Sequence, residues 1–174
     1  SMPGGDFDPA WSPDGKKIAF SSVRDSELSH IYIYDLETKT TSLLTNSSTY
    51  DHRPAWSPDG TKLAFESTRL GKPQLFVMEL ETGKEREFTT LDAQDDHMPS
   101  WAPDGLVIAF NTGARKIIIK QYGDRNAREF VVAPDAGPSV DASFSPDGIW
   151  LVYEGWQIGE NNHDIYLVTR NGTG

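Results

Sequence analysis

The stretch PAWSPDG at residues 9–15 decides the fold, because the chain repeats it three more times. It returns as PAWSPDG at 54–60, as PSWAPDG at 99–105 and as ASFSPDG at 142–148. The aromatic residues of these stretches are spaced by 45, 45 and 43 residues: Trp11, Trp56, Trp101 and Phe144. A fixed period of this length is typical of repeat architectures, in which each module stacks on its neighbours. We therefore expect these aromatic residues to occupy equivalent positions, packed between neighbouring modules.

Each repeat is predicted to form four β-strands. Ser-Pro-Asp-Gly suits the four positions of a type I turn after the first strand, which gives a structural role to its aspartates. These aspartates are Asp14, Asp59, Asp104 and Asp147. Segments such as 18–20 and 31–33 alternate with period 2 or are rich in β-branched and aromatic residues, as strands require. No 11-residue window shows a convincing helical period.

Four-stranded repeats of this length predict an all-β fold, a β-propeller built of four tandem antiparallel blades. The blades should cover about 6–45, 51–90, 96–133 and 139–170 of a single domain, 6–174, after a short tail at 1–5. The last blade should lack its fourth strand, because 170–174 is short and rich in glycine. A β-sandwich of sequential hairpins is the alternative, but it does not explain the same turn at the same place in every repeat.

The repeats resemble a known family. PAWSPDG-x-x-[IL]-A-F, followed by Ser-x-Arg at 22–24 and 67–69 and by Ile-Tyr-x-x-Asp-Leu at 31–36, resembles the WD40-like PD40 repeat. That repeat builds TolB-like propellers and those of tricorn-type and prolyl-oligopeptidase-like proteins. The third repeat departs from the pattern at 111–113 and 117–118, and the fourth has Phe144 in place of tryptophan and Ser139 in place of aspartate.

The resemblance implies a propeller that acts as a non-catalytic platform for a protein, peptide or other ligand. Two alternatives are a regulatory propeller segment of a peptidase-like protein and a metal-dependent lyase or hydrolase on the propeller axis. TolB-like propellers typically have more than four blades. Four repeats therefore allow three interpretations: a fragment, a short natural protein or half of an assembly. An open ring would expose the apolar faces of its end blades, so self-association through these blades is expected.

Composition narrows the function classes. The chain has 16 Lys and Arg against 26 Asp and Glu, a net charge of −10, which argues against nucleic acid and favours basic partners or cations. It has no cysteine, which excludes thiol catalysis and cysteine zinc sites. It has no run of 18 apolar residues, so no membrane insertion is expected. Without G-x-S-x-G, H-E-x-x-H or a phosphate loop, neither an enzyme nor a required cofactor is expected.

The compartment is less constrained. The composition agrees with a periplasmic or other extracytoplasmic location, whereas the absence of cysteine leaves the compartment open, a cytoplasmic location included. Residues 1–5 lack the apolar core of a signal peptide.

Binding residues are expected where the repeats differ. The segments that join the second and third strands differ in length, and the fourth, 154–164, is the richest in aromatic and hydrogen-bonding side chains. Its candidates for partner contact are Trp156, Glu160 and His163. The alternative for Trp156 is that it only caps its own blade.

The entries to the first strands give a second candidate site. Asp6, Asp51 and Asp96 each lie five residues before the repeated aromatic residue, and His52 and His97 follow two of them. Such carboxylates could bind a divalent cation such as Ca²⁺, or each could accept hydrogen bonds from nearby backbone N–H groups of its own loop. The two histidines depend less on the repeat and are the better candidates for ligand contact.

The two Ser-x-Arg motifs also allow a structural and a ligand-binding interpretation. Arg24 and Arg69 could join neighbouring blades, by stacking on an aromatic ring or by pairing with a carboxylate. They could instead present their guanidinium groups to a ligand carboxylate.

Overall fold

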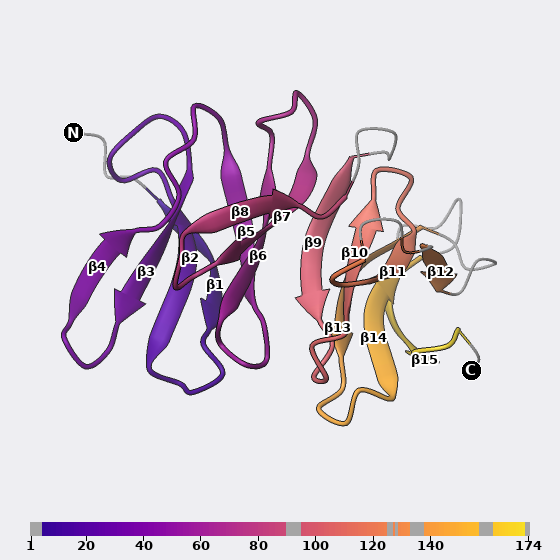
Figure 1. Ribbon diagram of the computed structural model, residues 1–174. Coiled ribbons are helices and arrows are strands. Elements are labelled where there is room, and N and C mark those ends of the chain that lie inside the picture. The colour runs from indigo at the N-terminus through magenta and orange to yellow at the C-terminus, as the bar shows by residue number, and fades with distance from the viewer. Residues whose placement is uncertain are drawn as a thin grey trace. The chain divides into compact units, whose positions relative to one another are not determined.

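The computed structural model describes residues 5–89, 95–124, 127, 129–132, 138–156 and 162–172. These residues form fifteen β-strands in four antiparallel sheets, three of four strands and a last one of three (Figure 1). The predicted all-β fold of four propeller blades is confirmed, and the fourth blade has three strands among the described residues. Within this part of the chain, no helix is long and apolar enough to span a membrane.

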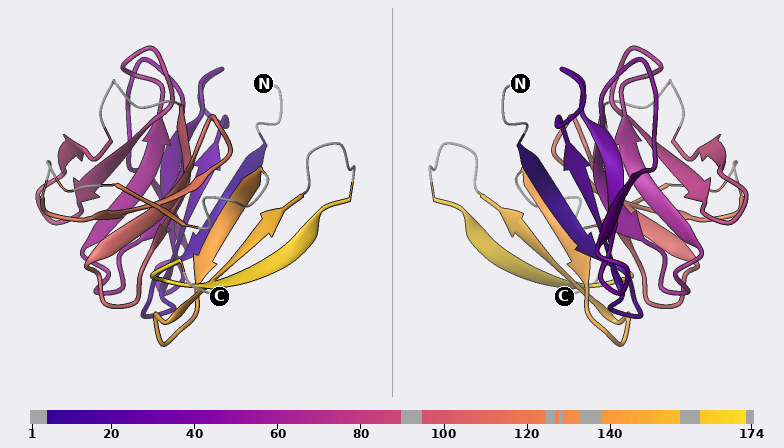
Figure 2. Two further views of the ribbon diagram at one scale, coloured as in Figure 1. Left: turned by 90° about the vertical axis from the view of Figure 1, so that its right-hand side faces the viewer. Right: turned by 90° about the vertical axis from the view of Figure 1, so that its left-hand side faces the viewer.

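The chain divides into two compact units, residues 1–91 and 92–174, each with two blades. The first blade consists of β1 (Asp6–Trp11), β2 (Lys17–Ser22), β3 (His30–Asp35) and β4 (Thr40–Leu43). The second consists of β5 (Asp51–Trp56), β6 (Lys62–Ser67), β7 (Gln74–Glu79) and β8 (Lys84–Glu87). The third consists of β9 (Asp96–Trp101), β10 (Val107–Thr112), β11 (Ile117–Gln121) and β12 (Phe130–Val132). The fourth consists of β13 (Ser139–Phe144), β14 (Trp150–Gly155) and β15 (Asp164–Thr169), with β15 at the edge of its sheet (Figure 2).

The Ser-Pro-Asp-Gly turn closes the first hairpin of each blade. In the second blade the Gly60 N–H donates to the Ser57 carbonyl at 2.9 Å, and Gly60 has a φ of 70°, a conformation that side chains disfavour. The Asp59 carboxylate accepts the Thr61 N–H at 3.0 Å and the Ser57 hydroxyl at 2.5 Å. The glycine N–H makes the equivalent bond in the other three blades, at Gly15, Gly105 and Gly148.

Replacing Ser57 by alanine tests how much this turn contributes. The Ser57 hydroxyl also accepts the Lys62 N–H at 2.9 Å, so its loss should lower the free energy of unfolding by about 1 kcal/mol. Its hydrogen bond is the main reason why the pKa of Asp59 lies below its usual range. A lowered pKa in the folded state stabilises the fold above the unfolded pKa of about 4, and this stabilisation is lost as the pH falls. The variant should therefore lose less stability between neutral and acid pH, which urea unfolding at several pH values measures.

The third blade is a natural control for this effect. It has Ala102 where the other turns have serine, and Asp104 there still accepts the Leu106 N–H at 2.9 Å. Ala102→Ser should raise the free energy of unfolding, whereas an unchanged stability in both variants would contradict a role for the hydroxyl.

Each first strand contains a β-bulge, where its pairing with the second strand shifts register. The bulge residue has a φ between 51° and 57° in every blade: Asp8, Arg53, Met98 and Asp141. This conformation costs residues with a side chain about 1 kcal/mol, and bulges redirect side chains out of the regular pleat. The sequence did not predict the bulge, because the four residues share no type that favours it.

One face of each sheet joins the two blades of a unit. In the first unit the core that joins them contains Ala19, Ile31, Leu63, Phe65, Phe76 and Met78, with Ile33 and Trp56 packed against it. The Trp56 Nε1–H also donates to the Ala10 carbonyl of the first blade at 3.1 Å. In the second unit the equivalent core contains Ala109, Ile117, Ile119, Leu151, Tyr153 and Val168. The same joint between blades is thus built twice from equivalent positions.

The repeated aromatic residues do not share one environment. Trp56 packs on the preceding blade, Phe144 packs against the core of its unit, and Trp101 is buried and meets Tyr122 edge-on at 4.8 Å. Trp11 is 60% exposed, so the expectation that it packs between blades is wrong. The reason is that the second blade covers the opposite face of the first sheet.

Candidate functional site

In each unit, the segments between second and third strands lie beside the entries to the first strands. The Thr68 N–H donates to the Tyr50 carbonyl at 3.0 Å, and the Trp156 N–H donates to the Pro138 carbonyl at 3.2 Å. We call this end of each unit the loop face, defined by residues 23–29, 68–73, 113–116, 156 and 162–163 with 5, 50, 95 and 138. The Ser-Pro-Asp-Gly turns lie at the other ends of the same strands, which we call the turn face.

In the first blade, Asp6, Ser22 and Arg24 bind one another on the loop face. The Asp6 carboxylate accepts the Ser22 hydroxyl at 2.6 Å and Arg24 Nη2 at 2.8 Å. The Arg24 guanidinium also lies over the rings of Phe20 and Tyr32, 4.9 and 5.1 Å from their centres. The hydrogen bond from Ser22 and the contact with Arg24 lower the pKa of Asp6, so this carboxylate stays ionised at neutral pH.

The second blade repeats this arrangement with deeper burial. Arg69 Nη2 donates to Asp51 at 3.1 Å, and Arg69 Nε donates to the Ser67 hydroxyl at 2.9 Å. The guanidinium lies over the ring of Phe76 at 4.5 Å and pairs with Glu85 of β8. The Asp51 side chain is fully buried, whereas the Asp6 side chain is half exposed.

Both arginines therefore bind within their own blades. Their contacts differ from the alternative in which Arg24 and Arg69 join neighbouring blades, because each guanidinium is held by an aspartate, a serine and two rings of its own sheet. A ligand carboxylate would have to compete with these internal contacts. The contacts of Asp6 and Asp51 are with side chains of their own blades, at Ser22 and Arg24 and at Arg69, and differ from the predicted bonds to backbone N–H groups of their own loops.

The predicted cation site is not assembled by the residues that the structure describes. In that part of the chain, no group of three or more His, Asp and Glu side chains is placed to hold a metal ion. Asp6 and Asp51 each bind an arginine and Asp96 is fully buried in β9. The positions of these three carboxylates are therefore better explained by a structural role than by metal binding.

His52 lies on the loop face of the first unit, where its ring is half-buried. Its Nδ1 lies 3.0 Å from the Ser29 hydroxyl of the first blade, and its ring stacks on Tyr50 at 5.8 Å and meets Phe7 at 5.9 Å. Burial lowers its pKa, so the ring is neutral at pH 7. His97 is partly buried at the start of β9. His52 thus belongs to a contact between two blades, which leaves part of its ring for a ligand.

The richest arrangement on the loop face is in the second unit, around Trp156. The His163 ring stacks on the Trp156 ring at 4.4 Å with 6° between their planes, and His163 Nδ1 contacts Glu154. The Arg115 guanidinium of the third blade lies 5.1 Å from the Trp156 ring centre. The predicted residues Trp156 and His163 are therefore brought together, whereas Glu160 lies outside the described residues.

Arg115 and Glu154 complete this cluster, and neither was among the binding residues predicted from the sequence. Arg115 lies in the shortest of the four segments between second and third strands, whereas the binding residues were predicted in the longest of these segments. Trp156 does more than cap its own blade, because it contacts side chains of both blades of its unit. We call Arg115, Glu154, Trp156 and His163 the Trp156 cluster.

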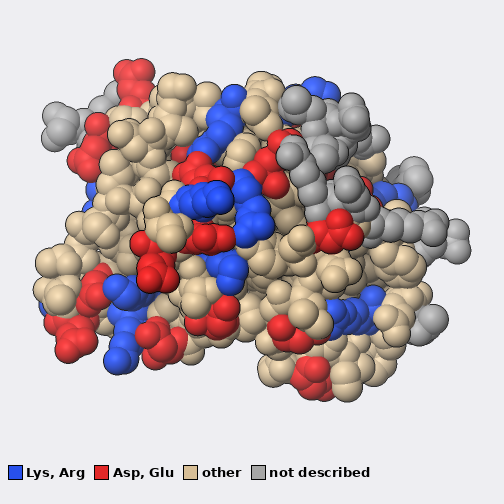
Figure 3. Space-filling model, in the orientation of Figure 1, with Lys and Arg blue, Asp and Glu red and all other residues tan. Residues whose placement is uncertain are grey.

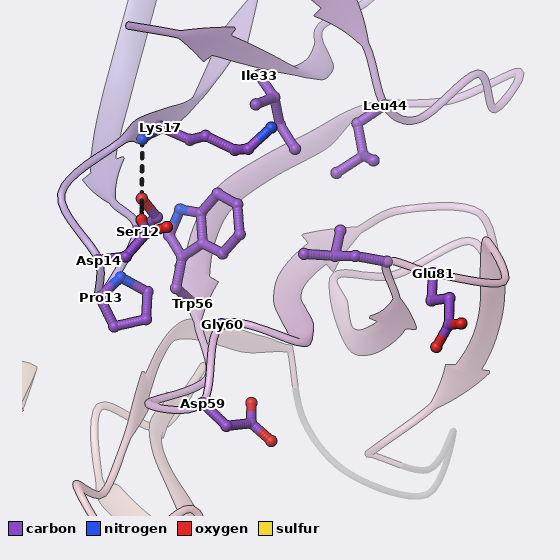
Figure 4. A pocket seen from close by; sticks show the side chains of 11 residues that line it. Ser12, Pro13, Asp14, Lys17, Ile33, Leu44, Trp56, Asp59, Gly60 and Glu81 are labelled. Atoms are coloured by element: carbon purple, nitrogen blue, oxygen red, sulfur yellow. Dashed lines mark hydrogen bonds between the residues drawn. The ribbon is translucent and has the colours of Figure 1, made fainter. Parts of the chain in front are cut away.

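The turn face of the first unit contains a pocket of about 440 Å³ between its two blades (Figure 4). Trp56 lies beside the turn of the first blade, and Ile33 and Leu44 line the pocket across from its ring. Its acidic residues are Asp14, Asp59 and Glu81. The sequence did not predict this pocket, because most of its lining residues are those that every repeat uses to hold its fold.

Acidic and basic side chains alternate on the face in Figure 3. The exposed ion pairs of the chain include Arg86 of β8 with Glu79 of β7 at 2.7 Å. Exposed pairs of this kind stabilise the fold by less than about 1 kcal/mol.

Comparisons with known proteins agree with this architecture. The chain matches the TolB beta propeller domain (PD40) model over residues 1–174. It resembles TolB from Acinetobacter baumannii, with a TM-score of 0.87 and 26% identity over 97% of this chain and 42% of that chain. It resembles a putative TolB from Agrobacterium tumefaciens, with a TM-score of 0.83 and 24% identity over 96% of this chain and 62% of that chain. A prolyl endopeptidase structure shares the fold, with a TM-score of 0.70 and 17% identity over 97% of this chain and 28% of that chain. The chain thus spans less than two thirds of the length of these proteins, and it belongs to the family of TolB β-propeller domains.

Proposed function

We propose that this chain is a non-catalytic platform that binds a protein or peptide on the loop face of its second unit. The observation that carries the proposal is the Trp156 cluster. Tryptophan and arginine are the residues that most often dominate binding energy at protein interfaces, and here they are already stacked.

The cluster offers a partner two kinds of contact. The side chain of His163 is half exposed and that of Glu154 one-third exposed, so both can meet a partner while remaining in contact with each other. The stacking of His163 and Arg115 with Trp156 restricts these side chains before binding, which lowers the entropy lost on association. Such an arrangement suits a peptide that supplies hydrogen bonds and an apolar side chain.

The net charge of the chain adds a preference for basic partners. At −10, the chain attracts cationic segments over long range, and this attraction should weaken as salt is added.

Selection from a phage-displayed library of random peptides tests this function. Synthetic copies of selected peptides should bind the wild type, and Trp156→Ala should weaken binding by about 30-fold, which corresponds to about 2 kcal/mol. His163→Ala should weaken it in the same direction. Circular dichroism and thermal melting check that both variants remain folded.

Leu106→Ala is the matched control, because Leu106 is exposed on the turn face of the same unit. It should bind the selected peptides like the wild type. The proposal is wrong if no peptide is selected, or if the Trp156 and His163 variants bind as well as the wild type.

A further inference from the structure

The pocket on the turn face of the first unit combines apolar side chains with an excess of carboxylates. Its volume of about 440 Å³ lies within the usual range for ligand sites, and its walls come from the first two blades. The apolar side chains that line it include those of Ile33, Leu44, Trp56 and Leu80. The charged side chains that line it are those of Asp14, Lys17, Asp59 and Glu81. Such a lining suits a ligand that has an apolar stem and a positive charge.

The charges of this pocket favour a cation. Lys17 does not oppose one strongly, because its Nζ is already paired with the Asp35 carboxylate of its own blade at 2.9 Å. A serine hydroxyl of the same turn lowers the pKa of Asp14 and that of Asp59, so both carboxylates are negative at neutral pH. The pocket therefore presents negative charge to a ligand.

The second unit has an equivalent place on its own turn face. In both units the turn glycine of the later blade lies against the turn proline of the earlier blade. A Cβ added to Gly60 would lie 3.3 Å from Pro13, and one added to Gly148 would lie 3.5 Å from Pro103. The repeated aromatic residue of the later blade also packs in the joint in both units. The two places can therefore be compared residue by residue.

Residues 80 and 170 are equivalent, because each follows the third strand of the later blade and makes the same backbone hydrogen bond. The Leu80 N–H donates to the Thr61 carbonyl at 3.0 Å, and the Arg170 N–H donates to the Ile149 carbonyl at 2.8 Å. Both acceptors directly follow the turn glycine. One position of the joint is thus occupied by leucine in the first unit and by arginine in the second.

Arg170 fills this place in the second unit. Its guanidinium lies 6.0 Å from the ring centre of Phe144, which is the equivalent of Trp56. Its Nη1 donates to the carboxylate of Asp104, the turn aspartate of the earlier blade and the equivalent of Asp14. The chain therefore already binds one arginine side chain of its own with the repeated aromatic ring and the turn carboxylate. In the first unit the same ring and carboxylate line an open pocket (Figure 4).

The two carboxylate oxygens of the turn aspartate have separate partners. Asp104 accepts the Leu106 N–H with Oδ1 and the Arg170 guanidinium with Oδ2. Asp14 likewise accepts the hydrogen bonds of its own turn with Oδ1. Among the residues that the structure describes, none donates a hydrogen bond to Asp14 Oδ2. The oxygen that binds arginine in the second unit is therefore available in the first.

We propose that the turn-face pocket of the first unit binds an arginine side chain of a peptide segment of a partner protein. The stem of that side chain packs on Ile33 and Leu44, while its guanidinium stacks on Trp56 and pairs with Asp14. Arginine suits this place better than lysine, because its planar group can stack on a ring and pair with a carboxylate at once, and tryptophan is the best aromatic partner for a cation. The inference does not rest on the Trp156 cluster, which belongs to the other unit.

Nuclear magnetic resonance titration of the isotopically labelled chain tests this site with arginine capped by acetyl and methylamide groups. The probe is added up to about 20 mM, because a single side chain is expected to bind in the millimolar range. The Trp56 Nε1–H resonance should shift as the probe binds. The citrulline version of the probe has nearly the same shape without the charge and should bind at least about tenfold more weakly. The lysine version should also bind more weakly than arginine, because an ammonium group cannot stack as a plane.

Two variants locate the bound probe. Leu80→Arg should fill the pocket as Arg170 fills its equivalent and should weaken binding by about tenfold, since a tethered side chain competes at a high effective concentration. Asp14→Asn keeps an oxygen for the turn but removes the charge, and it should also weaken binding by about tenfold. Asp147→Asn is the matched control, because Asp147 accepts the same bonds in the turn of the fourth blade, and it should bind the probe like the wild type. Circular dichroism checks that all three variants remain folded.

Four results would each overturn the proposal. An unchanged Trp56 resonance at the highest probe concentration would show that the pocket binds no arginine side chain. Equal binding of the citrulline and arginine probes would show that the charge is not recognised. Unchanged binding in both the Leu80→Arg and the Asp14→Asn variants would place the probe elsewhere. Tighter binding of free arginine than of the capped probe would show that the pocket takes the amino acid and not a side chain of a peptide.

Discussion

Replacing Trp56 by alanine should lower the free energy of unfolding by about 3 kcal/mol, the low end of the range for removing a buried tryptophan. The indole joins the core between the first two blades, and its Nε1–H donates to the Ala10 carbonyl at 3.1 Å. The loss therefore includes both apolar contact and a hydrogen bond across the joint. Because Trp56 is only partly buried, we expect no more than this low-end value. Urea unfolding followed by circular dichroism measures the change.

Trp56→Phe separates the two contributions. Phenylalanine keeps most of the ring contact and removes only the indole N–H, and Phe144 occupies the equivalent position of the fourth blade. This variant should lose about 1 kcal/mol, the usual net contribution of one hydrogen bond. A loss well below 1 kcal/mol for the alanine variant would show that Trp56 does not hold the two blades together.

The fold could be predicted because the same local signals recur in every repeat. Ser-Pro-Asp-Gly specifies a turn wherever it occurs, and strands such as β2 and β3 show the alternation or β-branched composition that sheets require. The bulge could not be predicted, because its positive φ falls on an aspartate in two blades, Asp8 and Asp141, but on Arg53 and Met98 in the others, which do not favour it. That conformation is imposed by the sheet around it.

Burial was less predictable than the fold, because it depends on which face a neighbouring blade covers. Trp11 and Trp56 have the same local sequence, PAWSPDG, yet one is mostly exposed and the other packs in a joint. The Trp156 cluster was predicted in part, since an unusual loop composition identified Trp156 and His163. The contact with Arg115 comes from the neighbouring blade, and no sequence signal links residues 115 and 156.

Replacing Asp51 by alanine should also lower the free energy of unfolding by about 3 kcal/mol, the low end of the range for breaking a buried ion pair. The Asp51 side chain is fully buried, with Arg69 Nη2 at 3.1 Å and His30 Nδ1 at 4.0 Å. Without Asp51 the Arg69 guanidinium would retain Glu85, which keeps the cost at the low end. Asp51→Asn should cost less, because it keeps the shape and an oxygen that accepts a hydrogen bond.

Asp6→Ala is the matched control for Asp51→Ala, and urea unfolding of both variants decides the prediction. Asp6 accepts hydrogen bonds from Arg24 and Ser22, but its side chain is 51% exposed, so its loss should cost less than about 1 kcal/mol. Equal costs for the two variants would show that burial by the neighbouring blade is not what strengthens the pair.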